Sequence, residues 1–252
     1  MKLKIYRHPL QELTVPSFVA NDTFLVGGAS GGHSNETSQR SNESPVRVSQ
    51  AGSVAGIIER PSMLMMTGPN YSGKSVYLKQ IALIVYMAHV GCFVPAEKAV
   101  IGLTDKILTR ITTRETVSKT QSAFMIDLQQ VALAISLATS RSLVIIDEFG
   151  KGTESNGMFR LQSEFQILIL ALDGAGLACG VFEHLLELDE ERPKVLGATH
   201  FHEIFENGFL GPRPSLGFGH MQVRVEIEAA DVEDQITYLY KYKHPKPYGV
   251  LC

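Results

Sequence analysis

The sequence has few cysteines and no apolar run long enough to cross a membrane. Its three cysteines, Cys92, Cys179 and Cys252, are far apart and lack the paired spacing of a metal site. No secretory signal is apparent, so they are expected to be free thiols in a reducing compartment. The strongest apolar run, residues 81–90, contains His89 and is too short for a bilayer. These absences exclude a disulfide-stabilised secreted domain and predict a soluble chain without a membrane partner.

The sequence also lacks an excess of positive charge. A net charge of -3 and a pI near 6.2 supply no broad basic field, so this chain alone is not expected to bind duplex DNA tightly. Any nucleic-acid contact would be local or made by other parts of a longer protein. The 252 residues, 44% of them hydrophobic, suffice for one sizeable α/β core.

Composition divides the chain into an opening lobe, an insertion and a principal domain. Residues 1–26 mix β-forming residues with prolines and predict a small strand-rich lobe. Residues 27–52 are rich in Gly, Ser, Asn, Gln and Glu. Such a segment cannot bury enough apolar surface to order itself, so a flexible insertion is expected. Residues 53–252 are expected to form the principal domain.

Hydrophobic patterning in the principal domain predicts strands that alternate with helices. Strands are expected over residues 62–67, 105–111, 143–146, 195–198, 221–227 and 236–242, and helices over 74–90, 122–139 and 177–188. This alternation implies a largely parallel sheet whose functional residues lie at the carboxyl ends of its strands.

A glycine-rich loop lies between the first of these strands and the helix that follows it. It fits G-x-x-x-x-G-K-[ST] and consists of Gly68, Pro69, Asn70, Tyr71, Ser72, Gly73, Lys74 and Ser75. The loop backbone can wrap a β-phosphate, Lys74 can reach the β and γ oxygens, and Ser75 can ligate Mg²⁺. A plain surface turn is the alternative, but such a match arises by chance in roughly one chain in a hundred. Tyr71 is bulky for this loop, so its ring is expected to point outward.

The apolar strand over residues 143–146 runs directly into two acids. Asp147 is expected to hold the Mg²⁺ shell, and Glu148, pointing the other way, to polarise the attacking water as general base. Alone, such a pair is more often two solvated acids, but the upstream loop favours a metal and phosphate site that binds and hydrolyses ATP. His200, after the strand over 195–198, could contact the γ-phosphate or the water, although a lone histidine is more often structural.

Several short blocks occur in a characteristic order. They are RHPL at 7–10, FVAND at 18–22, the segment 67–75, SAFMID at 122–127, IDEFGKGT at 146–153 and ATH at 198–200. Together they resemble the MutS family of mismatch-repair ATPases, and the resemblance covers most of the chain. It implies a P-loop NTPase fold of the ABC-ATPase type, with a mostly parallel sheet flanked by helices and a small amino-terminal strand-rich lobe.

The resemblance implies roles for further residues. Phe18 and Val19 match the pair that contacts adenine, although such residues are also ordinary core of a small lobe. Ser122 matches the residue that reaches the nucleotide of the partner subunit, while as a bare sequence feature it is a helix N-cap. His200 matches the histidine beside the γ-phosphate.

The resemblance also implies cofactors, partners and a location. ATP and Mg²⁺ are the implied cofactors. The blocks YLKQ at 77–80 and FVPA at 93–96 are most like meiotic members of the family, which act as heterodimers of two MutS homologues on recombination intermediates. A second MutS homologue, DNA bound through regions absent from this chain, and a nuclear, chromosomal location are therefore expected.

One segment departs from the family pattern. Residues 157–172 separate the Gly-Thr after the carboxylates from Asp173 and Gly174, where family members connect the two directly. We interpret this segment as a translated short intron, which the mature transcript would test. The alternative functions are a nucleotide-binding or dimerisation module that does not turn over, and an ABC-type ATPase of another kind. The latter ranks low because the chain has SAFM at 122–125 where a Ser-Gly-Gly signature would stand.

Overall fold

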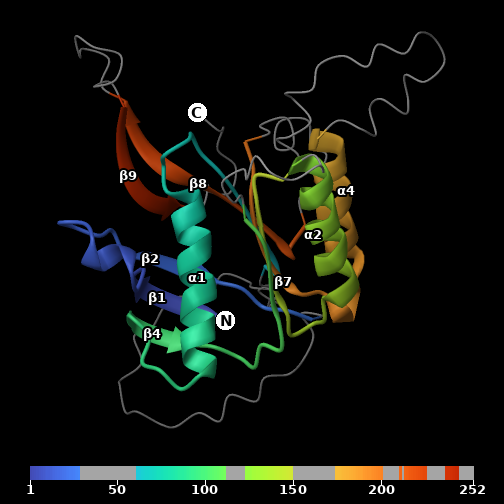
Figure 1. Ribbon diagram of the computed structural model, residues 1–252, viewed down its shortest axis with the longest axis horizontal. Helices are drawn as coiled ribbons and strands as arrows, with labels where there is room; N and C mark the ends of the chain where they lie inside the picture. The colour runs from blue at the N-terminus through green and yellow to red at the C-terminus, as the bar shows by residue number, and fades with distance from the viewer. Residues whose placement is uncertain are drawn as a thin grey trace, which may run out of the picture.

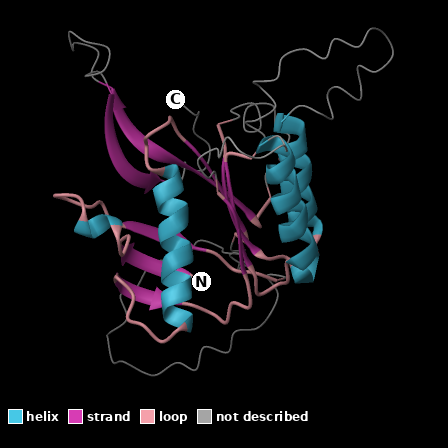
Figure 2. Cartoon of the chain, viewed as in Figure 1, coloured by secondary structure: helices cyan, strands magenta, loops and turns pink. Residues whose placement is uncertain are grey.

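The structure, a computed structural model, describes residues 1–28, 61–111, 123–149, 174–200, 210–211, 213–225 and 236–243. These residues form a larger and a smaller β-sheet with three α-helices (Figure 1). Helix α1 (Lys74–His89) packs against both sheets. Helices α2 (Ala123–Leu137) and α4 (Gly174–Glu187) cover the opposite face of the larger sheet (Figure 2). The predicted α/β class, with a mostly parallel sheet flanked by helices, is confirmed.

The larger sheet has six strands in the order β5-β6-β7-β3-β8-β9. Their bounds are β3 Met63–Thr67, β5 Ile107–Arg110, β6 Leu143–Asp147, β7 Lys194–Ala198, β8 Leu216–Val225 and β9 Ile236–Lys243. All neighbours are parallel except β8 and β9, which pair antiparallel. The carboxyl ends of β6, β7 and β3 therefore lie next to one another, where ligands of open α/β sheets usually bind.

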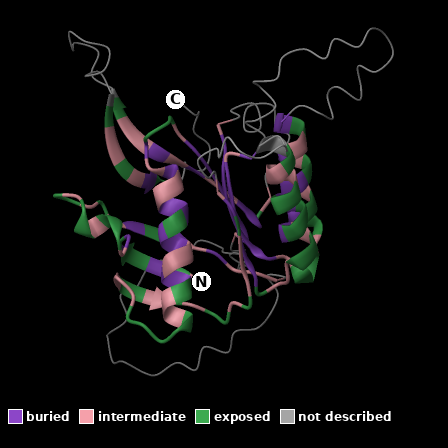
Figure 3. Cartoon of the chain, viewed as in Figure 1, coloured by how far each residue is buried: buried purple, intermediate pink, exposed green. Residues whose placement is uncertain are grey.

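The central strands are buried on both faces, as Figure 3 shows. On β3, Met63 and Met65 belong to the core formed with α2 and α4, whereas Leu64 and Met66 belong to the core formed with α1. Residues two apart on a strand point to the same face, so a strand covered on both faces reads as continuously apolar. Charged residues within such strands need polar partners.

The smaller sheet is antiparallel and has the order β2-β1-β4. Strands β1 (Lys2–Tyr6) and β2 (Asn21–Phe24) come from the opening segment, where strands are expected. Strand β4 (Ala96–Val100) follows α1 and is not predicted by the sequence, because Ala-Glu-Lys-Ala-Val has little apolar alternation. Its pairing with β1 makes it a strand. Residues 29–60 and 150–173, which carry most of both predicted insertions, lie outside the described residues.

Most helices and strands begin and end close to the predicted residues, and the exceptions have tertiary causes. Strand β8 begins at Leu216 rather than at 221, because its first half pairs with β3. Strand β5 begins at Ile107 rather than at Asp105, because the Asp105 carboxylate accepts hydrogen bonds from side chains before β6. Helix α4 begins at Gly174, three residues earlier than expected.

Two sequence expectations concern membranes and thiols. Within the described part of the chain, none of the helices has the length and apolar character needed to span a membrane. Cys92 and Cys179 are free thiols, and Cys252 lies outside the described residues.

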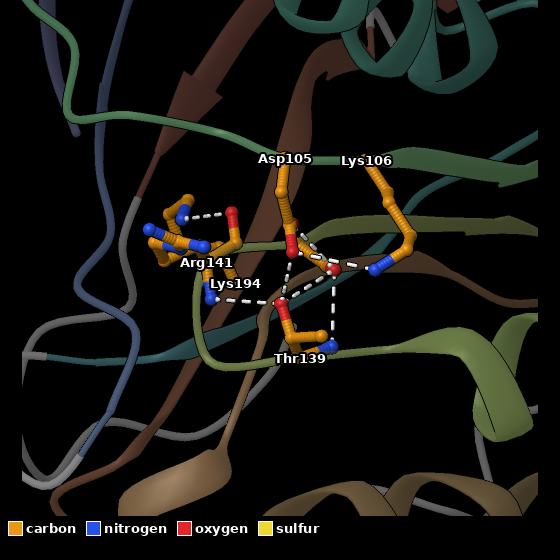
Figure 4. Close-up of polar contacts among 6 residues, drawn as sticks. Asp105, Lys106, Thr139, Arg141 and Lys194 are labelled. Carbon is orange, nitrogen blue, oxygen red and sulfur yellow. Dashed lines mark hydrogen bonds and ion pairs between the residues drawn. The ribbon is translucent and has the colours of Figure 1, made fainter.

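Asp105 forms a polar cluster at the amino ends of β5 and β6 (Figure 4). Its carboxylate accepts hydrogen bonds from the hydroxyls of Thr139 (2.6 Å) and Ser142 (2.9 Å), which precede β6, and lies 3.3 Å from the ammonium of Lys106. The hydrogen bond from Thr139, with those from Ser142 and Lys106, holds the pKa of Asp105 below its ordinary value. The cluster ties the chain before β5 to the turn between α2 and β6.

Lys194, the first residue of β7, connects a third strand to this end of the sheet. Its buried ammonium donates to the carbonyl of Arg141 (3.0 Å), in the same turn (Figure 4). Burial lowers the pKa of Lys194, and the charge of Asp105 opposes that change.

We expect Asp105→Ala to lower the free energy of unfolding by about 1–3 kcal/mol at pH 7, because it removes hydrogen bonds to a charged group. A depressed carboxyl pKa stabilises the folded state above the unfolded-state pKa of about 3.9 and loses that effect as pH falls below it. The difference between variant and wild type should therefore shrink below about pH 4. Urea unfolding at several pH values measures it. Asp189→Asn, at a side chain 87% exposed, is the control and should change stability by less than about 0.5 kcal/mol.

Candidate nucleotide-binding site

The glycine-rich loop joins buried strand β3 to helix α1, in the predicted order. Gly68 has φ +149°, and a Cβ there would lie 3.0 Å from Oγ of Ser72 and 3.2 Å from Cβ of Met221. Gly73, the N-cap of α1, has φ +96°, and a Cβ there would lie 3.1 Å from the ring of Tyr240. Both positions require glycine, because side chains rarely adopt these conformations and neighbours fill the space. The loop thus brings its backbone to the amino end of α1, whose free N–H groups attract anions.

Tyr71 occupies the outer side of the same loop. Its backbone has φ +66°, an uncommon value for a residue other than glycine. The residue is 87% exposed. The expectation that the Tyr71 ring points outward is confirmed.

Lys74, the first residue of α1, is only 5% exposed. Its ammonium donates to the carbonyls of Gly68 (2.6 Å) and Pro69 (3.0 Å) and lies 3.9 Å from Oε1 of Glu148. A buried charge is costly unless it is paired and hydrogen-bonded. The loop therefore holds one positive charge beside the acid at the end of β6.

Asp147, the last residue of β6, is 2% exposed. Burial raises the pKa of its carboxyl, and the charge of Glu148 acts in the same direction, while a hydrogen bond from Ser75 and the charges of Lys74 and Arg110 oppose it. Among the described residues, Oδ1 of Asp147 has no hydrogen-bond partner. A buried carboxylate oxygen without a donor, joined to a serine hydroxyl, matches the oxygen ligands that Mg²⁺ prefers.

Glu148, the residue directly after β6, has a left-handed backbone conformation. Its φ is +51°, and its backbone N–H donates to the carbonyl of Ala198 on β7 (2.9 Å). Such left-handed conformations are rare for residues with a side chain and gather at functional sites. This backbone turn separates the two acids: Asp147 stays within the buried strand, and Glu148 lines a cavity.

The cavity has a volume of about 610 Å³, in the range of small-molecule sites. Four parts of the chain line it: side chains within residues 11–21 of the opening segment, the glycine-rich loop with the first turns of α1, Glu148, and the pair of strands β8 and β9. The predicted site residues on its wall are Phe18, Val19, Asn70, Ser72, Gly73, Lys74, Ser75 and Glu148. The structure thus gathers most of the predicted phosphate-binding residues and both predicted adenine-contacting residues around one space.

The predicted site residues that do not line the cavity are Gly68, Pro69, Asp147 and His200. Asp147 is joined to the cavity wall by its hydrogen bond with Ser75. His200 follows β7, whose neighbours in the sheet are β6 and β3, so it lies at the strand end between the acids and the loop. Ser122 lies outside the described residues.

Sequence reasoning missed two residues on the far wall of the cavity. Tyr240 of β9 and Met221 of β8 line it, and both approach the loop glycines. No short motif marks either residue, because their place depends on how β8 and β9 pair with the rest of the sheet. Only the predicted strands over 221–227 and 236–242 pointed to this region.

Arg110 is a third residue that the sequence did not single out. It is buried at the end of β5, donates to the backbone carbonyl of Asp147 and forms an ion pair with Asp127 of α2. One side chain therefore joins the carboxyl end of β6 to the first turns of α2. Asp127 lies within the block SAFMID, but that block alone gave no partner for it.

We expect Asp147→Asn to raise the free energy of unfolding at pH 7, by about 1 kcal/mol as for other single stabilising substitutions. A raised carboxyl pKa means that ionisation costs the folded state stability as pH rises above the unfolded-state value. The gain should therefore vanish as pH falls below about 3.9, where both states are protonated. Thermal unfolding across pH measures it, with Asp189→Asn as control. A variant less stable than wild type at pH 7 would contradict the burial argument.

A strand, a glycine loop and a helix, set in a mostly parallel sheet between helices, define the P-loop class of nucleotide-binding proteins. The family model described as MutS domain V matches residues 64–250 of this chain. The chain therefore belongs to the MutS family, whose members are ATPases in general.

Individual relatives agree with this assignment. The chain is 37% identical to MutS protein homolog 5 of Saccharomyces cerevisiae over 261 aligned residues, covering 98% of the chain and 25% of that protein. It is 43% identical to the DNA mismatch repair protein MutS of Borrelia hermsii over 56% of the chain and 14% of that protein. The chain is 36% identical to the DNA mismatch repair protein MutS of Clostridium tetani, over 81% of the chain and 18% of that protein. The chain thus spans a quarter or less of the length of these relatives.

Proposed function

We propose that this chain binds Mg·ATP in the cavity beside α1 and hydrolyses it, as the ABC-type ATPase domain of a MutS-family protein. The observation that carries the proposal is the convergence of three groups on one space. These are the loop with Lys74, the acid Glu148 that directly follows Asp147 at the end of β6, and the apolar pair Phe18 and Val19. The loop suits a triphosphate, an acidic group suits a metal ion, and an apolar pair suits a purine base.

The triphosphate lies against the glycine-rich loop in this proposal. Backbone N–H groups at the start of α1 contact the β-phosphate, and the Lys74 ammonium exchanges its two carbonyl partners for β and γ oxygens. Phe18 and Val19 pack on the adenine from the opening segment. Tyr240 faces the same space from β9.

Ser75 and Asp147 hold the magnesium ion in this proposal. The Ser75 hydroxyl acts to lower the pKa of the Asp147 carboxyl, against the effect of burial, and Oδ1 of Asp147 is buried without a partner among the described residues. The metal supplies charge neutralisation at the β and γ oxygens. Its positive charge would also lower the pKa of Asp147, which burial raises.

Turnover requires a base and contacts to the γ-phosphate. Glu148 lines the cavity close to Lys74 and is the proposed general base for the attacking water. His200 is the proposed contact to the γ-phosphate or that water. Ser122 of a second subunit is proposed to complete the site, as the family resemblance implies.

The biological setting is proposed from the relatives. The likeness to MutS protein homolog 5 covers 98% of the chain, which supports a role in meiotic recombination rather than mismatch repair. MutS homologue four is the proposed partner in a heterodimer. DNA is bound through other regions of the parent protein in this proposal, and the protein acts on chromosomes in the nucleus.

Calorimetric titration of the folded chain with Mg·ATP, followed by single-turnover hydrolysis with and without the partner's ATPase domain, tests the proposal. We expect saturable Mg²⁺-dependent binding and hydrolysis that increases when the partner domain is added. Absence of Mg·ATP uptake by well-folded protein would overturn the binding site. Binding without hydrolysis, even with the partner domain, would favour the alternative of a nucleotide-binding and dimerisation module.

A further inference from the structure

Asn21 connects two walls of the cavity that are far apart in the sequence. It is the first residue of β2, is 3% exposed, and lines the cavity. Its side-chain amide donates to the carbonyls of Val19 (3.3 Å) and Tyr240 (3.1 Å), and its Oδ1 accepts from the backbone N–H of Tyr242 (2.8 Å). One buried amide therefore binds the carbonyl of Tyr240, the N–H of Tyr242 on the other side of Lys241, and the backbone beside Phe18.

The part of β9 that Asn21 contacts is irregular. Met221 pairs with Tyr242 and Val223 pairs with Tyr238, so three residues of β9 lie opposite one residue of β8. Tyr240, in the middle of this bulge, has φ +51°. Bulges leave backbone groups outside the ladder and redirect side chains, often beside functional sites. The Asn21 amide satisfies two such groups, the carbonyl of Tyr240 and the N–H of Tyr242, which lie on either side of Lys241.

A second hydrogen bond joins the opening segment to β9. The ammonium of Lys241, within the bulge, donates to the carbonyl of Ala20 (2.5 Å), the residue between Val19 and Asn21. Lys241 is partly buried and extends the link between the opening segment and β9. Residues 19–21 are thus fixed to residues 240–242 rather than merely packed against them.

We propose that Asn21 is a positioning residue for the base end of the nucleotide site. It sets the separation between Phe18 and Val19 on one wall and Tyr240 on the other, without itself holding the phosphates. The inference rests on the proposed function, because it assumes that a nucleotide base occupies this part of the cavity. Phosphate binding, at the loop and Lys74, depends on contacts that Asn21 does not make.

The test compares two ligands that share the phosphates and differ in the base. Mg·ATP and Mg·tripolyphosphate are titrated calorimetrically into wild type, Asn21→Ala and Asn21→Asp. The aspartate variant keeps the acceptor for Tyr242 and loses the donors to Val19 and Tyr240. Both variants should weaken Mg·ATP about tenfold, as expected for the loss of one to two hydrogen bonds that fix a binding wall. Affinity for Mg·tripolyphosphate should stay within about twofold.

The matched control is Asp22→Asn, one residue along β2. Asp22 is exposed, accepts a hydrogen bond from the N–H of Ile5 and does not line the cavity, so both affinities should match wild type. If Asn21→Ala does not fold, the near-isosteric Asn21→Asp answers the question. If the ratio of the Mg·ATP affinity to the Mg·tripolyphosphate affinity is the same in the folded variants as in wild type, the proposed role of Asn21 is wrong, while the proposed function still stands. Failure of wild type to bind either ligand would overturn the proposed function and this inference with it.

Discussion

Lys74→Ala should lose measurable Mg·ATP binding, with affinity at least about 100-fold below wild type. Lys74 is 5% exposed, and its ammonium donates to two loop carbonyls and lies 3.9 Å from Oε1 of Glu148. In the proposed complex it contacts two phosphate oxygens, and each charge-assisted hydrogen bond contributes about 1.5–3 kcal/mol. Two such bonds correspond to a loss of two or more powers of ten. Calorimetry or fluorescent-nucleotide titration measures the effect.

Lys79→Ala is the control for Lys74→Ala. Lys79 lies on the same helix, is exposed and does not border the cavity. Its substitution by alanine removes the same charge as Lys74→Ala. Its affinity for Mg·ATP should remain within about twofold of wild type, because an exposed charge at this distance is screened. Comparable losses in both variants would show that net charge, and not the loop lysine, governs binding. If Lys74→Ala retained Mg·ATP binding, the proposal that the nucleotide lies against the glycine-rich loop would be wrong.

Glu148→Gln should retain Mg·ATP binding and lose hydrolysis by about 10²–10⁴-fold, the usual contribution of a general base. The amide has nearly the shape of the carboxylate but cannot accept a proton from water. Glu148 already lies at the cavity wall with its backbone held by Ala198, so its replacement should not move β6. Single-turnover hydrolysis in the presence of the partner domain is the measurement, with Mg·ATP affinity determined in parallel.

Glu187→Gln, at an exposed residue that ends α4, is the control for Glu148→Gln. It should leave both binding and hydrolysis unchanged. Equal hydrolysis by wild type and Glu148→Gln would assign the base to another group, with His200 as the next candidate. Loss of binding in Glu148→Gln would instead indicate that the pair with Lys74 holds the loop together.

The geometry of the proposed phosphate-binding half of the site could be predicted from the sequence because its signals are local. The glycines, Lys74 and the buried strand before them lie within one short segment, and the helix after them has an obvious start. The same holds for Asp147 and Glu148, which end a strand of uninterrupted apolar residues. Parallel strands place such ends at one edge of the sheet, so the two motifs had to meet.

The arrangement of the proposed base-binding half could be predicted only in part, because it depends on long-range pairing. Phe18 and Val19 were assigned from the family resemblance, and no local pattern distinguishes them from core residues. Tyr240 reaches the cavity through a bulge in β9, and Asn21 reaches Tyr240 across 219 positions of sequence. Strand β4 escaped prediction for a similar reason, since pairing with β1 and not its own composition makes it a strand. Ser122 lies outside the described residues and stays a prediction.

The bonds that join residues 19–21 to residues 240–242 bear on how the protein acquires its ligand during synthesis. The strand, loop and helix proposed to hold phosphate have been synthesised once α1 has been made, but Tyr240, on the wall proposed for the base, follows more than 150 positions later. Contacts of such high sequence separation form late in folding. Under the proposed function, a growing polypeptide would therefore meet ATP with only the loop side of the site formed, and full affinity should arise only after β9 has been synthesised.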